Sequence, residues 1–281
     1  GNGGPGSPYY TIGQGIAAAS DGDTVSVAAG TYVENINFYS KKIAVMGEDK
    51  ATTIIDGNQS GSVVIMEDTG EDALLSGFTV KNGSGLVQEN GHTSGGGIYI
   101  KGSNDVGPTL TDLIVSNNES RNGGGIYISN SGPKLNNISI YANEAYIGGG
   151  INIYKLMIPI LTNVTISGNT ADYSDGGLHN TNAYPVLINT IIWGNSAPTA
   201  NSIEHNDHDM TIQYSNIEGG QENIETGSDA NLIWGDGNVN IDPLFVDASS
   251  GDFTLQSGSP CIDTGHPDRD GDETPWQGDP D

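Results

Sequence analysis

The sequence has few basic residues, a single cysteine and no long apolar segment. Nine Lys and Arg stand against 35 Asp and Glu, so the formal net charge at pH 7 is -26. This charge repels a phosphate backbone and excludes nucleic acid as a partner. No apolar run reaches the ~18 residues of a membrane-spanning helix. Cys261 has no second cysteine with which to form an internal disulfide.

Glycine, in contrast, is abundant, at 42 of 281 residues. It does not recur at every third position, which excludes a collagen-like helix. An acidic chain rich in glycine and poor in lysine is typical of proteins that work where dissolved cations screen their charge. We therefore expect an extracellular or cell-surface location.

The main feature of the sequence is an internal repeat. A glycine triplet followed by alternating apolar and polar residues occurs three times and then, weakened, a fourth time. Its last glycines are separated by 28, 25 and 27 residues. A Pro-x-Leu motif and a column of asparagines follow at similar steps. The positions are Gly97, Gly125, Gly150 and Gly177; Leu110, Leu135, Leu161 and Leu187; Asn118, Asn143, Asn169 and Asn195.

This repeat predicts an all-β fold, a right-handed parallel β-helix (solenoid) of roughly nine rungs. Each repeat holds short alternating strands between Gly, Asn and Pro turns, with no segment long enough for a crossover helix. The leucine column should stack inside the coil, and the asparagines should lie at its bends. Residues 11–20 have the pattern of a short amphipathic helix that would cap the N-terminal end of the rod. We expect a linker-like segment at 1–10, one β-helix domain at 11–265 and an acidic tail at 266–281.

Two stretches resemble known proteins. The run Gly22-Asp23-Thr24-Val25, with Ala29 to Ile36 after it, is similar to the opening of pectate-lyase-like β-helix proteins. Asn240 to Val246, Gly251 to Leu255 and Gly258 to Gly265 resemble the end of the choice-of-anchor Q group. That resemblance implies a secreted bacterial surface protein with a parallel β-helix. It does not imply one chemistry, because the wider class includes lyases, hydrolases, epimerases and adhesins.

Outward-facing aromatic residues at the rung spacing are candidates for carbohydrate binding, because rings can stack on sugars. Stacked tyrosines also stabilise sheet faces without any ligand, so both interpretations stay open. The candidate carbohydrate-binding residues are Tyr99, Tyr127, Tyr154, His179 and Trp193.

Lyase chemistry requires a base and a cation beside a uronic acid carboxylate. Lys101 and Arg121 are the candidate catalytic pair, because basic residues are so scarce, and Lys134 and Lys155 are alternatives by position. The motifs of the pectin hydrolases and alginate epimerases of this class are absent from the sequence.

Two acidic segments are candidate metal sites. The tail carries Asp268, Asp270, Asp272 and Asp279 at spacings like those of a calcium loop, although its glycine and closing residue depart from that pattern. The run from Glu204 to Asp209 has two histidines among carboxylates, which can bind zinc or copper. An exposed polar loop is the simpler explanation of this second segment.

Together these features predict a secreted, non-catalytic β-helix module that binds extracellular polysaccharide or associates with itself, with Ca²⁺ as a candidate cofactor. A calcium-assisted polysaccharide lyase and a structural subunit of an extracellular fibre are the alternatives.

Overall fold

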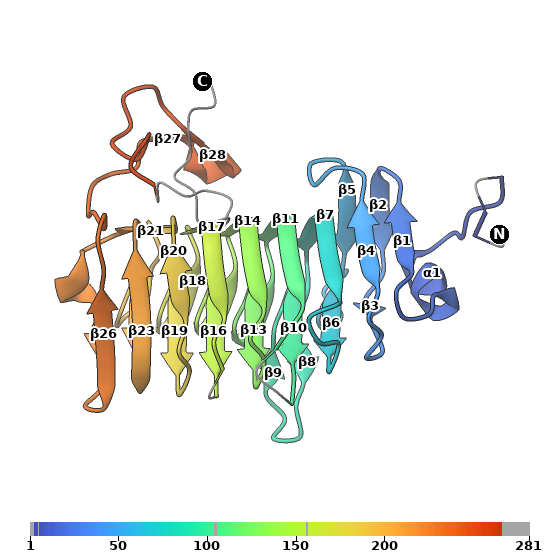
Figure 1. Ribbon diagram of the computed structural model, residues 1–281, viewed down its shortest axis with the longest axis horizontal. Helices are drawn as coiled ribbons and strands as arrows, with labels where there is room; N and C mark the ends of the chain where they lie inside the picture. Colours follow the sequence, from blue (N-terminus) through green and yellow to red (C-terminus); the bar gives the residue numbers. More distant parts are fainter. Residues whose placement is uncertain (1–2, 5, 104–105, 156, 266–281) are drawn as a thin grey trace.

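The computed structural model describes residues 3–4, 6–103, 106–155 and 157–265. It is an all-β, right-handed parallel β-helix of about eight turns, which confirms the predicted fold class with a turn fewer than expected. The turns stack along the long axis of a rod (Figure 1). Within the described residues no helix is long and apolar enough to cross a membrane.

Three parallel sheets form the sides of the rod. The first, called the long sheet here, has 13 strands. In chain order they are β1 (Thr24–Val27), β2 (Gly30–Val33), β4 (Ala44–Gly47), β5 (Thr53–Asp56), β7 (Leu74–Lys81), β11 (Thr109–Ser116), β14 (Lys134–Tyr141), β17 (Ile160–Ser167), β20 (Val186–Ile188), β21 (Ile191–Trp193), β23 (His208–Gln213), β24 (Asn216–Ile217) and β26 (Ala230–Trp234).

The eight-stranded sheet carries the strands that follow the glycine triplets. Its members are β3 (Ile36–Asn37), β6 (Val64–Glu67), β10 (Ile98–Lys101), β13 (Ile126–Ser129), β16 (Ile151–Tyr154), β19 (Leu178–Thr181), β22 (Ile203–His205) and β25 (Glu225–Thr226). The five-stranded sheet precedes the triplets and comprises β8 (Leu86–Val87), β9 (Thr93–Ser94), β12 (Glu119–Asn122), β15 (Glu144–Ile147) and β18 (Thr170–Ser174), of which β8 and β9 pair antiparallel.

Like residues stack on like residues inside the coil, as the repeat predicts. The leucine column pairs in register through β11, β14, β17 and β20, and every member is at most 1% exposed. The isoleucines after the glycine triplets form a second buried column in the eight-stranded sheet. These columns merge into one continuous apolar core along the rod. Because side chains alternate along each strand, the residues between them project outward.

The two ends of the described chain differ. Helix α1 (Ile12–Ala18) begins at the N-cap Thr11, whose hydroxyl accepts a hydrogen bond from the amide of Gln14. Ile12 and Ile16 are buried against the first turn, so the helix covers the N-terminal end of the core as predicted (Figure 1). The short 3₁₀ turns are η1 (Gln221–Asn223) and η2 (Ala248–Ser250).

Near the other end, β27 (Phe245–Asp247) and β28 (Asp252–Leu255) form an antiparallel hairpin. The hairpin folds back over the long sheet, where the Phe253 ring packs edge-on against Tyr141.

Candidate functional site

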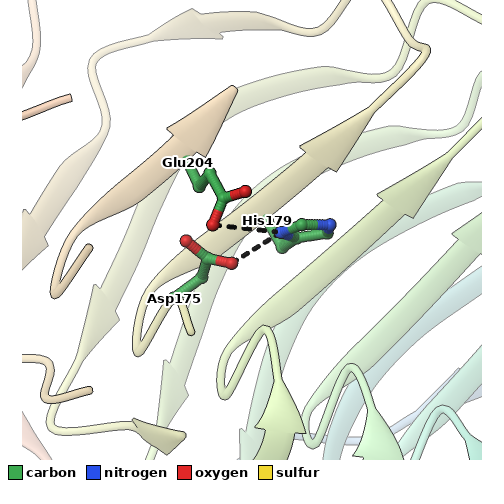
Figure 2. A group of neighbouring side chains, drawn as sticks. All are labelled: Asp175, His179 and Glu204. Atoms are coloured by element: carbon green, nitrogen blue, oxygen red, sulfur yellow. Dashed lines mark hydrogen bonds and ion pairs between the residues drawn. The ribbon is translucent and has the colours of Figure 1, made fainter. Parts of the chain in front are cut away.

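A cluster of one imidazole and two carboxylates lies where the five-stranded sheet turns into the eight-stranded sheet. Asp175 occupies the turn between β18 and β19, His179 lies on β19, and Glu204 lies on β22 of the next turn of the coil. His179 and Glu204 are direct partners in the parallel register, so their side chains project from the same outer column. Figure 2 shows both carboxylates turned toward the His179 ring.

The distances within the cluster are short. Nδ1 of His179 is 2.5 Å from Oδ2 of Asp175 and 4.0 Å from Oε2 of Glu204. The other ring nitrogen, Nε2, lies 2.8 Å from the Thr181 hydroxyl oxygen. The ring is therefore held at both nitrogens, which sets its orientation.

Neighbouring polar groups hold Glu204. The Ser174 hydroxyl donates a hydrogen bond to its Oε2 and the Asn206 amide donates to its Oε1, each at 2.5 Å. Burial pushes the pKa of Glu204 upward, but these two hydrogen bonds and the nearby imidazole hold it below its ordinary value. Glu204 is therefore an anion beside His179 at neutral pH.

The pKa of Asp175 is shifted in the opposite direction to that of Glu204. Burial raises the pKa of its carboxyl to about 6, although the hydrogen bond with His179 opposes that rise. Its side chain is fully buried, and Oδ1 accepts no hydrogen bond from the residues that the structure describes. An orphaned carboxylate oxygen of this kind is unusual, because buried polar atoms are normally paired.

The sequence pattern indicates two members of this cluster but not Asp175. His179 is a candidate for carbohydrate binding in the sequence, and Glu204 belongs to the candidate histidine-rich loop. That loop does not bring its own histidines together with Glu204. Both ring nitrogens of His205 are engaged, one with the Asn180 amide and one with the backbone carbonyl of His208. Burial also lowers the pKa of His205, which favours the neutral ring.

A signal for Asp175 is present in the repeat. It stands before Gly176-Gly177, where the three preceding repeats have a first glycine: Gly95, Gly123 and Gly148. Those glycines adopt φ values of 64°, 65° and 68°, and Asp175 adopts 66°. An aspartate therefore keeps the left-handed backbone of a glycine column.

An aromatic ladder lies on the neighbouring outer face, on the five-stranded sheet. The Arg121 guanidinium sits 4.4 Å above the centre of the Tyr146 ring. Tyr146 in turn stacks on Tyr173, with ring centres 5.2 Å apart and planes at 12°. Tyr173 is 56% exposed, so one end of this ladder is open to solvent.

The candidate carbohydrate-binding residues are distributed over more than one face. Tyr99 and Tyr127 stack at 5.5 Å on the eight-stranded sheet, as their register predicts. Tyr99 is only 2% exposed, and burial raises its pKa to about 12, so its ring is not available to a sugar. Tyr154 is 38% exposed on the same sheet. Trp193 lies on the long sheet, paired with Ser167, and so belongs to another side of the rod.

The candidate lyase residues have different surroundings. Lys101 ends β10 and lines a cavity of about 160 Å³ together with Lys42 and Asp72. Arg121 lies on the five-stranded sheet, on Tyr146. The contacts described for each do not include the other, and their joint catalytic role stays a prediction. The four aspartates of the candidate calcium loop, Asp268, Asp270, Asp272 and Asp279, lie outside the described residues.

The sequence matches no family model and no curated protein. Among solved structures, pectin methylesterase from carrot superposes with a TM-score of 0.56, covering 88% of this chain and 94% of that one at 14% sequence identity. The two proteins share the parallel β-helix fold. At this identity the similarity concerns the fold alone.

Proposed function

We propose that the chain is an extracellular module that binds polysaccharide on the outer face formed by Arg121, Tyr146 and Tyr173 of the five-stranded sheet, called the tyrosine face here. One observation carries the proposal: the rings of Tyr146 and Tyr173 stack on successive turns, and Tyr173 exposes more than half of its surface. Exposed rings at the spacing of the turns offer a repeating polymer repeated contacts. Display on a cell surface, as in the choice-of-anchor Q group, is part of this proposal.

The charge of the protein restricts the type of glycan. A net charge of -26 repels polyanions over the whole surface, and the tyrosine face contributes a single cation, Arg121, already placed over a ring. We therefore propose neutral or weakly charged polysaccharides as ligands. The carrot structure carries the name of a pectin methylesterase, and highly methyl-esterified pectin is accordingly one member of the test panel.

The test is affinity electrophoresis through gels containing neutral glucans, methyl-esterified pectin, de-esterified pectin or alginate. We expect retardation by a neutral or esterified polymer, and weaker retardation after Tyr146→Ala with Tyr173→Ala. Truncating a central aromatic costs above ~1 kcal/mol, so affinity should fall at least about fivefold. Tyr39→Ala is the matched control, because Tyr39 is 66% exposed but precedes β4 at the N-terminal end of the rod.

Two outcomes would contradict the proposal. One is mobility that no polysaccharide changes, together with sedimentation showing filaments, which would favour the fibre subunit. The other is an unsaturated, ultraviolet-absorbing product from alginate or pectate that disappears in Lys101→Ala and Arg121→Ala variants. That product would establish the lyase.

A further inference from the structure

Asp175 departs from the repeat in a way that costs stability. Its left-handed φ of 66° matches Gly148 in the turn before, where a Cβ atom would lie 2.7 Å from the carbonyl oxygen of Ile151. The left-handed conformation is costly for residues with a Cβ, although aspartate tolerates it better than most. A residue held in this conformation at a position otherwise filled by glycine is a reason to look for a function.

The carboxylate of Asp175 is also incompletely satisfied. Oδ2 is bonded to His179, but Oδ1 is buried without a hydrogen bond from the described residues. Leaving such an acceptor unpaired destabilises the folded state, and more so when the group is charged. A cation bound at Oδ2 would neutralise this buried carboxylate and so lower the cost of its unpaired Oδ1, whereas a purely structural aspartate would leave that cost uncompensated.

The three side chains already converge. One ligand atom from each of Asp175, His179 and Glu204 lies within 4.8 Å of the others. Zinc binds nitrogen and oxygen at about 2.1 Å, so its ligand atoms are roughly 3.4 Å apart in a tetrahedral site. The separations from Nδ1, 2.5 Å and 4.0 Å, lie on either side of this value. Small side-chain shifts would therefore bring the three atoms to a common ion.

The residues around the cluster have the arrangement that metal ligands need. With a metal ion on Nδ1, the proton of His179 would sit on Nε2 and point at the Thr181 hydroxyl. Hydrogen bonds from Ser174 and Asn206 orient the Glu204 carboxylate. Partners of this kind fix the orientation of the residues that bind the metal directly and raise their affinity.

We propose that Asp175, His179 and Glu204 form a binding site for a divalent transition-metal ion of the zinc type. One imidazole and two carboxylates are the donor mixture that Zn²⁺ accepts. Ca²⁺ and Mg²⁺ prefer all-oxygen sites with six or more ligands, which this cluster does not supply. The site is independent of the tyrosine face and holds whether or not that face binds a glycan.

The test is isothermal titration of untagged, chelator-treated and dialysed protein with ZnCl₂, in buffer containing excess Ca²⁺. The Ca²⁺ saturates non-specific carboxylates and the acidic tail. We expect one saturable Zn²⁺ per chain, and a loss of affinity of at least about tenfold in Asp175→Gly and His179→Ala, since even outer partners contribute that much. Thr181→Val should weaken Zn²⁺ binding about tenfold, because the Thr181 hydroxyl would no longer orient the His179 ring.

The variants separate this site from the alternatives. Asp175→Gly restores the glycine of the repeat, so it should fold at least as stably as the parent, and circular dichroism checks this. His92→Ala, in an exposed loop, should bind Zn²⁺ like the parent. The proposal fails if the parent shows no saturable Zn²⁺ binding, or if Asp175→Gly binds as tightly as the parent. It also fails if His208→Ala abolishes binding while His179→Ala does not, because the ion would then lie in the loop from Glu204 to Asp209.

Discussion

Asp56 illustrates how one carboxylate stabilises a bend of the rod. Its oxygens accept hydrogen bonds from the backbone amide of Asn58 and from the side-chain amide of Asn82, and Lys81 lies 3.6 Å away. Burial alone would raise the pKa of Asp56, but these partners together hold it below its ordinary value of 3.8. The folded state therefore favours the charged form of this group.

This predicts an acid-sensitive contribution to stability. The contribution of Asp56 is fully present above about pH 3.8 and is lost as the pH falls through the lower pKa of the folded state. An Asp56→Asn variant lacks this pH-dependent stabilisation. The urea midpoint of the variant should therefore fall less than that of the parent between about pH 5 and about pH 3. Asp72→Asn, at an exposed carboxylate, is the control and should keep the acid response of the parent. Identical pH profiles for Asp56→Asn and the parent would contradict the prediction.

At the scale of elements, the asparagine column holds the bend between the long sheet and the five-stranded sheet. The Asn143 amide donates to the Val115 carbonyl and to Asn169, and its oxygen accepts from the backbone and side chain of Asn118. All of these groups are buried, so the ladder supplies hydrogen bonds that water cannot replace.

Asn143→Ala should therefore lower the free energy of unfolding by roughly 2–4 kcal/mol, because several buried groups lose partners worth about 1–3 kcal/mol each. Equilibrium urea denaturation measures this loss. Asn136→Ala, at an exposed position of the adjacent strand β14, should change the stability by less than about 0.5 kcal/mol. Equal losses in the two variants would show that the ladder does not carry this energy.

The residues of the tyrosine face do not recur at a constant spacing along the sequence, and the pairing of the five-stranded sheet explains why. Arg121 and Tyr146 each stand three residues after their ladder asparagines, whereas Tyr173 stands four after Asn169. A register shift between β15 and β18 takes up the extra residue and brings the Tyr173 ring onto Tyr146. The bulge is a property of strand pairing, which the one-dimensional spacing does not show.

At the scale of the whole molecule, helix α1 closes the N-terminal end of an otherwise open apolar core. Ile16 is fully buried there, and removal of a buried isoleucine side chain to alanine costs about 2–5 kcal/mol. Ile16→Ala should lower the urea midpoint and, by loosening the cap, promote end-to-end association detectable by light scattering. Ala17→Ser, on the exposed face of the same helix, should change neither measurement. A monodisperse Ile16→Ala variant of unchanged stability would contradict the role of the cap.

The repeat alone determined the architecture, because residues at matching positions of successive turns must stack when strands pair in parallel. The spacing of Leu110 to Leu187 assigns that column to the core, and the spacing of Asn118 to Asn195 assigns those residues to a bend. The capping helix follows from its apolar spacing. The sequence alone does not predict contacts between residues that depart from the spacing of the repeat.

Only the tertiary structure joined Asp175, His179 and Glu204, and it did so across neighbouring turns of the coil. Along the chain Glu204 lies next to the histidines of its own loop. Asp175 takes the place of the first glycine in an incomplete glycine triplet. The parallel register places Glu204 beside His179, and the left-handed turn points Asp175 at the same ring. Periodicity specifies which residues face in or out, whereas side-chain direction at a bend depends on backbone angles that the folded coil imposes.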